Sequence, residues 1–177
     1  MAYIDKHGVE YSDDKKTLVR CPEVYNGEYV VIDSVREIDR SAFENCKNLI
    51  SIVIPEGVTT IGTFAFCGCE KLTNVTLPMS IKHICNFAFA GCKSLPTFSF
   101  PHGVEIISKR VLSGCSSITS ITIPESVVDI GPLAFAECNN LSKILVPVGQ
   151  KQKFSSLLKG FVFGNNEDFK CEIIVER

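Results

Sequence analysis

The chain has 177 residues, of which 45% are hydrophobic, and a net charge of −2. This length is sufficient to bury a core without disulfides or a metal, and no apolar run approaches the roughly 20 residues of a membrane span. The near-neutral, mixed charge argues against nucleic acid or an anionic membrane as the main partner.

Residues 1–26 differ from the rest of the chain. Val9–Tyr11 and Thr17–Val19 flank the polar stretch SDDKK, which predicts a β-hairpin. Because the end of a stacked array exposes apolar core and strand edge, we expect this hairpin to be an N-terminal cap. The start, MAYIDKHGVEY, has no apolar leader segment. The sequence therefore predicts a cytoplasmic protein if Met1 is the native start, and a surface or secreted one if the start was trimmed.

From residue 27 one pattern returns every 23 residues. Full copies occupy 27–49, 50–72, 73–95, 96–118 and 119–141, and a partial copy occupies 142–149. A fixed period of 20–29 residues is the signature of a solenoid, in which each copy forms one coil and contacts mainly its neighbours.

The pattern L-x-x-I-x-I-P spans four boundaries between copies, starting at Leu49, Leu72, Leu95 and Ile118. This alternation predicts a short strand ended by proline. Stacked copies must pair these strands in parallel, so we expect one curved sheet, with strands near 28–32, 50–54, 73–77, 97–100, 119–123 and 142–146. The second part, V-x-x-I-x-x-x-A-F-x-x-C, suits a turn with a short helical or 3₁₀ segment. Its apolar positions predict core columns that include Phe66 and Phe89.

The outward strand positions form two rows of mostly small, uncharged side chains: Ser51, Asn74, Thr97, Ser120 and Lys143, and Val53, Thr76, Ser99, Thr122 and Leu145. Two interpretations stay open. Serine and threonine simply suit an exposed strand, or the rows form a surface on which a protein or peptide docks. The rows lack the Trp, Tyr and Arg anchors of tight interfaces, so binding there would be modest.

Nine cysteines are present, and five share one repeat position: Cys46, Cys69, Cys92, Cys115 and Cys138. Free cysteine packs as a small hydrophobe, so we expect a buried, reduced column and no disulfide within it. Cys67 and Cys85 lie off this column, at positions that accept polar residues elsewhere, and we expect them to be the more exposed thiols. No second cysteine or histidine pair completes a zinc site.

Catalytic chemistry has little support in the sequence. His7, His83 and His102 occupy unrelated positions, and no spacing supplies a nucleophile with a base and an orienting group. No Gly-rich phosphate loop or H-E-x-x-H motif occurs. We therefore predict no catalytic residue, no metal and no cofactor.

After Pro147 the repeat ends. Lys151–Lys159 has apolar residues at helical spacing, and Lys170–Val175 has the composition of a strand, which together predict a C-terminal cap. We expect a single domain over 1–177, with an N-terminal cap at 1–26, the repeats at 27–149 and a C-terminal cap at 150–177.

The pattern L-x-x-I-x-I-P-x-x-V-x-x-I-x-x-x-A-F-x-x-C over about 27–149 resembles the BspA-type leucine-rich repeat, common in bacterial and some protist proteins. The resemblance implies a right-handed leucine-rich-repeat solenoid, with a parallel sheet on one face and short turns or 3₁₀ segments on the other. It implies a non-catalytic protein-binding module whose partner and oligomeric state are unknown. Two alternatives are an adhesin-type surface protein that binds host or matrix proteins, and a structural scaffold without a ligand on the sheet.

Overall fold

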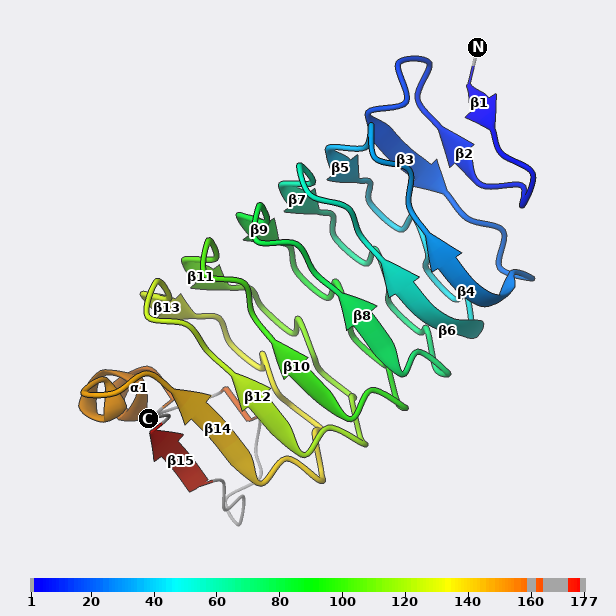
Figure 1. Ribbon diagram of the computed structural model, residues 1–177. Coiled ribbons are helices and arrows are strands. Elements are labelled where there is room, and N and C mark those ends of the chain that lie inside the picture. Colours follow the sequence, from blue (N-terminus) through cyan, green and yellow to red (C-terminus); the bar gives the residue numbers. More distant parts are fainter. Residues whose placement is uncertain (1, 159–161, 164–171, 176–177) are drawn as a thin grey trace.

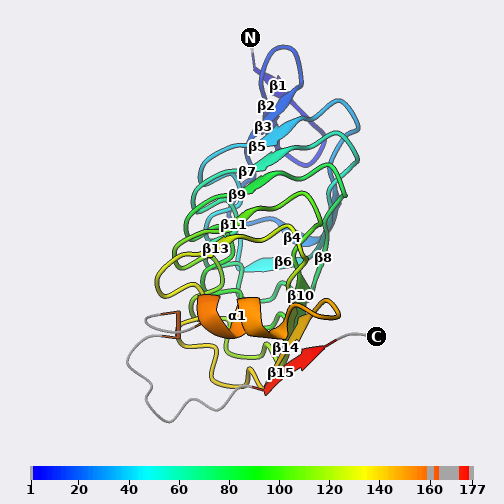
Figure 2. The ribbon, with the colours of Figure 1, turned by 90° about the vertical axis from the view of Figure 1, so that its left-hand side faces the viewer.

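Each 23-residue copy forms one coil, and the coils stack side by side into an elongated solenoid (Figure 1). The computed structural model describes residues 2–158, 162–163 and 172–175. Every coil has three sides: a front strand, a shorter side strand and a turn side, which are seen along the stack in Figure 2. The front strands are β4 (Asn26–Val30), β6 (Asn48–Val53), β8 (Asn74–Thr76), β10 (Thr97–Ser99), β12 (Ser120–Thr122) and β14 (Lys143–Val146).

The front strands pair in parallel at the same repeat position, as the period predicts. Ile52 lies opposite Val75, and Ile121 lies opposite Ile144. The prediction of one continuous sheet is wrong, however. The front strands form two sheets, β4-β6-β8 and β10-β12-β14, so pairing is interrupted between coils 73–95 and 96–118.

The side strands were not expected from the sequence. They are β5 (Glu37–Ile38), β7 (Thr60–Ile61), β9 (His83–Ile84), β11 (Ile106–Ile107) and β13 (Asp129–Ile130). On the turn side, the described residues contain turns and no 3₁₀ helix. Left-handed backbone occurs twice on the turn side of a coil, as at Phe64 (φ 60°) and Gly68 (φ 74°). This conformation does not continue a right-handed helix.

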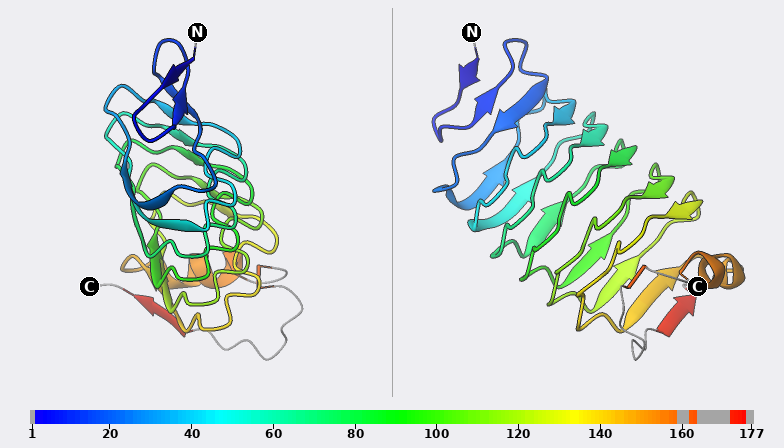
Figure 3. Two further views of the ribbon diagram at one scale, coloured as in Figure 1. Left: turned by 90° about the vertical axis from the view of Figure 1, so that its right-hand side faces the viewer. Right: turned by 180° about the vertical axis from the view of Figure 1, so that it is seen from behind.

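The N-terminal cap contains the predicted hairpin, β2 (Glu10–Tyr11) paired antiparallel with β3 (Thr17–Arg20). A further strand, β1 (Tyr3–Ile4), pairs with β2. The hairpin extends the side strands, because β3 pairs in parallel with β5. It therefore covers one edge of the array, as Figure 3 shows from behind.

The C-terminal cap also has the predicted elements. Helix α1 (Lys151–Leu157) lies at the end of the stack and buries Phe154 completely. Strand β15 (Glu172–Val175) pairs in parallel with β14 and becomes the last front strand.

The core lies between the three sides and consists of columns of equivalent residues. The rings of Phe43, Phe66 and Phe89 stack with centroids 5.0 Å apart, close to the spacing of adjacent strands. The coil at 96–118 interrupts this column with Leu112. The Phe98 ring, from that coil's front strand, lies 5.0 Å from the Phe89 ring of the preceding coil.

Candidate functional site

The front face of the solenoid carries the two outward rows predicted from the sequence. Parallel pairing aligns their members from coil to coil, as for Thr97 with Ser120 and Ser99 with Thr122. All ten predicted residues are exposed or partly exposed: Ser51, Val53, Asn74, Thr76, Thr97, Ser99, Ser120, Thr122, Lys143 and Leu145. Of these, only Lys143 carries a charge, so the face offers hydroxyls, amides and backbone more than ionic contacts.

Apolar side chains gather at the N-terminal end of this face. Val30 and Val53 lie opposite each other on β4 and β6 and are 67% and 41% exposed. Ile50, also on β6, is 41% exposed. The exposed Glu28 of β4 lies opposite Ser51, so this end combines aliphatic side chains with one charge, whereas β8, β10 and β12 are uncharged and mainly hydroxyl-rich.

One junction differs from all the others between repeats, and we call it the seam: the boundary between coils 73–95 and 96–118. At the junctions before and after it, the Ile54 N–H bonds the Thr76 carbonyl and the Phe100 N–H bonds the Thr122 carbonyl, at 3.1 and 3.0 Å. The equivalent bond at the seam, from Leu77 N–H to the Ser99 carbonyl, is missing. The side strands are also unpaired there, because no ladder joins β9 to β11.

The turn side holds the coils together across the seam. The N–H groups of Phe87, Phe89 and Gly91 bond to carbonyls of the next coil at 2.8–3.1 Å. The same three bonds occur at the preceding junction, from Phe64, Phe66 and Gly68. The two coils are therefore joined at the turn side and separated at the two strand sides.

Pro96 gives a local reason for the open front. In three other copies this position is Thr73, Thr119 or Ser142, and each bonds through both its N–H and its hydroxyl to the preceding coil's carbonyl. Proline has neither donor.

A crevice of about 330 Å³ opens on the front face at the seam, between β8 and β10. Its floor includes Val75 and Leu77, which are partly exposed. The equivalent residues in the other described copies are buried: Tyr29, Ile52, Phe98, Ile121 and Ile144 for Val75, and Val31, Ile54, Phe100, Ile123 and Val146 for Leu77. Sequence reasoning missed this front crevice, although proline at position 96 was a visible signal.

On the other strand side the seam opens a second crevice, of about 450 Å³. It is lined by Lys82, His83, Cys85, Glu105 and Ser108 among others, and its rim is charged. The structure thus brings His83 and Cys85 to one crevice, but among the described residues no group of three potential ligands is placed to hold a metal. His7 packs on tyrosines in the cap, and His102 is an exposed turn residue.

The cysteine column is buried, as predicted, and its thiols have a role that the sequence did not reveal. Cys69, Cys92, Cys115 and Cys138 each donate to the carbonyl of the residue in the phenylalanine column of the preceding coil, at 3.1–3.3 Å. Burial raises the pKa of the Cys92 thiol well above its usual value. All four thiols are buried and hydrogen-bonded, which makes them poor nucleophiles.

Cys21 lies beyond the N-terminal end of this column. It is buried, and its thiol interacts with that of Cys46, which with burial raises the Cys21 pKa. The column therefore has a sixth member from outside the repeats. Cys67 and Cys85 are only half-buried. Cys171 lies outside the described residues.

A polar cluster joins the N-terminal cap to the first coil. The Tyr29 hydroxyl donates to Asp5 Oδ2 at 2.6 Å, and Tyr11 and Tyr29 share a hydroxyl–hydroxyl bond. The backbone N–H groups of His7 and Val9 donate to Asp5 Oδ1 at 2.8 and 2.9 Å. Burial alone would raise the pKa of Asp5, but these hydrogen bonds outweigh it and lower the pKa. Burial raises the pKa of Tyr11 to about 12.

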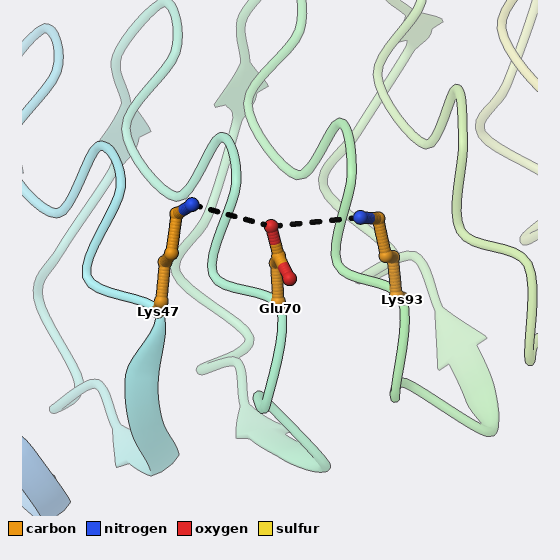
Figure 4. Close-up of polar contacts among 3 residues, drawn as sticks. All are labelled: Lys47, Glu70 and Lys93. Carbon is orange, nitrogen blue, oxygen red and sulfur yellow. Dashed lines mark ion pairs between the residues drawn. The ribbon is translucent and has the colours of Figure 1, made fainter.

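A short charge ladder lies on the loops beside the front face. Glu70 stands between Lys47 and Lys93 of the adjacent coils, at 3.7 and 3.5 Å (Figure 4). All three side chains are well exposed, so these ion pairs contribute little stability. They place two positive charges and one negative charge at the border of an otherwise nearly uncharged face.

The repeat geometry has counterparts among known proteins. A family profile described as a BspA type leucine rich repeat region matches residues 29–158 in six copies. The chain belongs to the BspA-type leucine-rich repeat family. Proteins built from this repeat are generally non-enzymatic interaction scaffolds. No curated protein matches the chain.

Solved structures with the same fold are bacterial leucine-rich repeat proteins. The T. pallidum leucine-rich repeat protein is 28% identical (TM-score 0.70), over 82% of this chain and 67% of its own. A leucine-rich cell surface protein from Faecalibacterium prausnitzii is 25% identical (TM-score 0.58), over 82% of this chain and 54% of its own. The pneumococcal vaccine antigen PcpA, at 24% identity, shares the fold (TM-score 0.79) over 99% of this chain and 48% of its own.

This BspA-type chain thus spans about half the length of the last two proteins. In its described part, no helix has the length and apolar character needed to cross a bilayer.

Proposed function

We propose that this chain is a non-catalytic protein-binding module that uses the front face of its solenoid. The observation that carries the proposal is the alignment of the ten outward residues across five successive strands, all at least partly exposed and nearly free of charge. Such a continuous surface spans several coils, so a partner that follows it contacts many equivalent positions at once. Membership of a family of interaction scaffolds supports the same conclusion.

The face favours a partner segment that is largely uncharged. Burying a charge without a partner is costly, and apart from Lys143 at one end the outward rows supply hydroxyls, one amide and apolar side chains but no counter-ions. The exposed Val30 and Val53 add an apolar area at one end. Because Trp, Tyr and Arg are missing from the ten positions, we expect micromolar binding, not nanomolar.

A capture experiment from native lysate tests this function. The double variant Thr76→Glu/Thr122→Glu places two charges on the front face. The matched control Thr63→Glu/Asn86→Glu makes the same charge change at partly or fully exposed positions of the turn side. We expect the front-face variant to lose captured proteins that the wild type and the control both retain. Equal capture by all three would contradict the proposal and favour a structural scaffold.

The adhesin-type alternative uses the same binding surface but places the protein on the cell surface and not in the cytoplasm. Similarity to a leucine-rich cell surface protein supports it. Biotinylation of intact source cells with a membrane-impermeant reagent separates the two locations. Labelled chain indicates the cell surface, and labelling only after lysis supports the cytoplasmic prediction.

A further inference from the structure

The front crevice at the seam is the place on the front face where the apolar core is accessible. Its floor contains Val75, Leu77, Leu95 and Phe98, and its rim contains Thr97 and Ser99. No charged side chain lines it. Its volume of about 330 Å³ is at the lower end of the roughly 300–1,000 Å³ of small-ligand sites. It can therefore take one large side chain.

The features that open the crevice are built into the chain. Pro96 has no N–H to bond the preceding coil. Phe98 also places a ring where Ile52 and Ile121 place smaller side chains, and this ring packs on Phe89 across the seam.

The strand edges at the crevice lack hydrogen-bond partners. The Leu77 N–H and the Ser99 carbonyl face the seam without the bond found at the neighbouring junctions. A free donor on one strand and a free acceptor on the next are the groups that an extended peptide backbone satisfies when it lies along a sheet edge. A compact small molecule could fill the floor, but it would not in general provide both an acceptor for the Leu77 N–H and a donor for the Ser99 carbonyl.

We propose that this crevice is an anchor pocket for one apolar side chain, the size of Leu to Phe, on an extended segment of the partner protein. The proposal rests on the function proposed above and names the feature of the partner that the front face recognises. The uncharged lining excludes Lys, Arg, Asp and Glu at the anchor position. The other described junctions between front strands are paired, so this anchor also sets the register of the partner on the solenoid.

A titration of ¹⁵N-labelled protein with the capped peptide acetyl-Thr-Phe-Thr-N-methylamide tests the pocket directly. We expect saturable shifts of the Leu77, Thr97 and Ser99 amide signals. The same peptide with central Leu should bind similarly, and those with central Ala or Lys about tenfold more weakly or worse, since the buried apolar area is lost. Shifts spread evenly along the solenoid, no shifts, or equal binding of all four peptides would each overturn the proposal.

Two variants locate the site. Thr97→Glu introduces a charge at the rim and should weaken the Phe peptide about tenfold, whereas Ser120→Glu, in the same outward row one coil later, should leave it unchanged. The variant Pro96→Thr/Phe98→Ile installs the residue types of neighbouring coils and should close the crevice and abolish binding. If this double variant fails to fold, the comparison of Thr97→Glu with Ser120→Glu still shows whether the peptide binds at the seam. Equal effects of these two would overturn the assignment.

The peptide titration and the lysate capture distinguish a failure of the pocket from a failure of the proposed function. Peptide binding at the seam with no front-face dependence of capture would contradict the proposed function and leave the pocket standing. Front-face dependence of capture without peptide binding would overturn the pocket alone. If the same amide signals shift with protein concentration in the absence of peptide, a second copy of the chain occupies the crevice and the peptide assignment is wrong.

Discussion

The Ser108 hydroxyl donates a hydrogen bond of 2.5 Å to the Ile84 carbonyl across the seam. At neighbouring junctions a backbone N–H makes this bond, from Cys85 to Ile61 at 2.9 Å and from Gly131 to Ile107 at 2.7 Å. A side chain thus replaces the backbone where the side strands separate.

Removing that hydroxyl should weaken the junction. We expect Ser108→Ala to lower the free energy of unfolding by about 1 kcal/mol, because a partly buried carbonyl loses its donor. Ser99→Ala, an exposed change on the front strand of the same coil, should stay within about 0.5 kcal/mol. Urea midpoints measure both. Equal midpoints for the two variants would mean that the hydroxyl bond carries no net energy.

Hydrogen exchange should reveal the seam in the unmodified protein. The Leu77 and Glu105 N–H groups have no partner across the seam, whereas their counterparts Ile54 and Val128 bond to adjacent coils. We expect the first two to exchange at least tenfold faster, since exchange follows local opening. Residue-resolved NMR exchange measures all four amides in one sample. Similar protection for all four would show that the seam is closed in solution.

Truncation of the aromatic column should be severe. Phe66 and Phe89 are completely buried and stack with their neighbours, so Phe66→Ala or Phe89→Ala should each cost roughly 3–5 kcal/mol through the cavity left behind. Ser120→Ala on the front face should change the stability by less than about 0.5 kcal/mol. The order of the urea midpoints checks this. A reversed order would contradict the assignment of inside and outside.

The thiols should differ in accessibility. In the native state we expect Cys67 and Cys85, which are half-buried, to react first with an alkylating reagent. The six buried thiols, Cys21, Cys46, Cys69, Cys92, Cys115 and Cys138, should react only after unfolding, because burial keeps the reagent away from the sulfur. Intact mass and peptide mapping before and after denaturation follow each site. Disulfides recovered from protein never exposed to oxidant would contradict a reduced column.

Acid should loosen the N-terminal cap through Asp5. Its pKa is lowered in the folded protein from 3.8, so its contribution to stability is present above that value and is lost as the pH falls through the folded pKa. Asp5→Asn should therefore be less stable than the wild type at pH 7, and the difference in the free energy of unfolding should shrink as the pH falls below 3.8. Asp33→Asn, an exposed change in the first coil, serves as control. A difference that persists unchanged at pH 2–3 would exclude the carboxylate as its cause.

The repeat pattern was sufficient to predict the stack and its register. Because equivalent residues recur every 23 positions, Ile52 must face Val75, and alternation then places Ser51 and Val53 outside. The same logic places the cysteine column in the core. These properties depend on the period, which can be read by comparing successive copies, and on the alternation within each copy.

The remaining features depend on contacts made by the N-terminal cap and by a coil whose residue types differ from those of its neighbours. The seam arises because Pro96 and Phe98 lie against a coil that carries Thr73 and Val75, and only the packing of the two coils shows that the front strands separate there. The bond between Asp5 and Tyr29 joins residues 24 positions apart, one of them outside the repeats. Cys21 likewise lies against Cys46 although no spacing relates them. Periodicity predicts contacts between equivalent positions. The contacts of Asp5 and Cys21 involve residues outside the repeats, and the seam involves residue types that depart from the pattern, so the tertiary structure alone decided them.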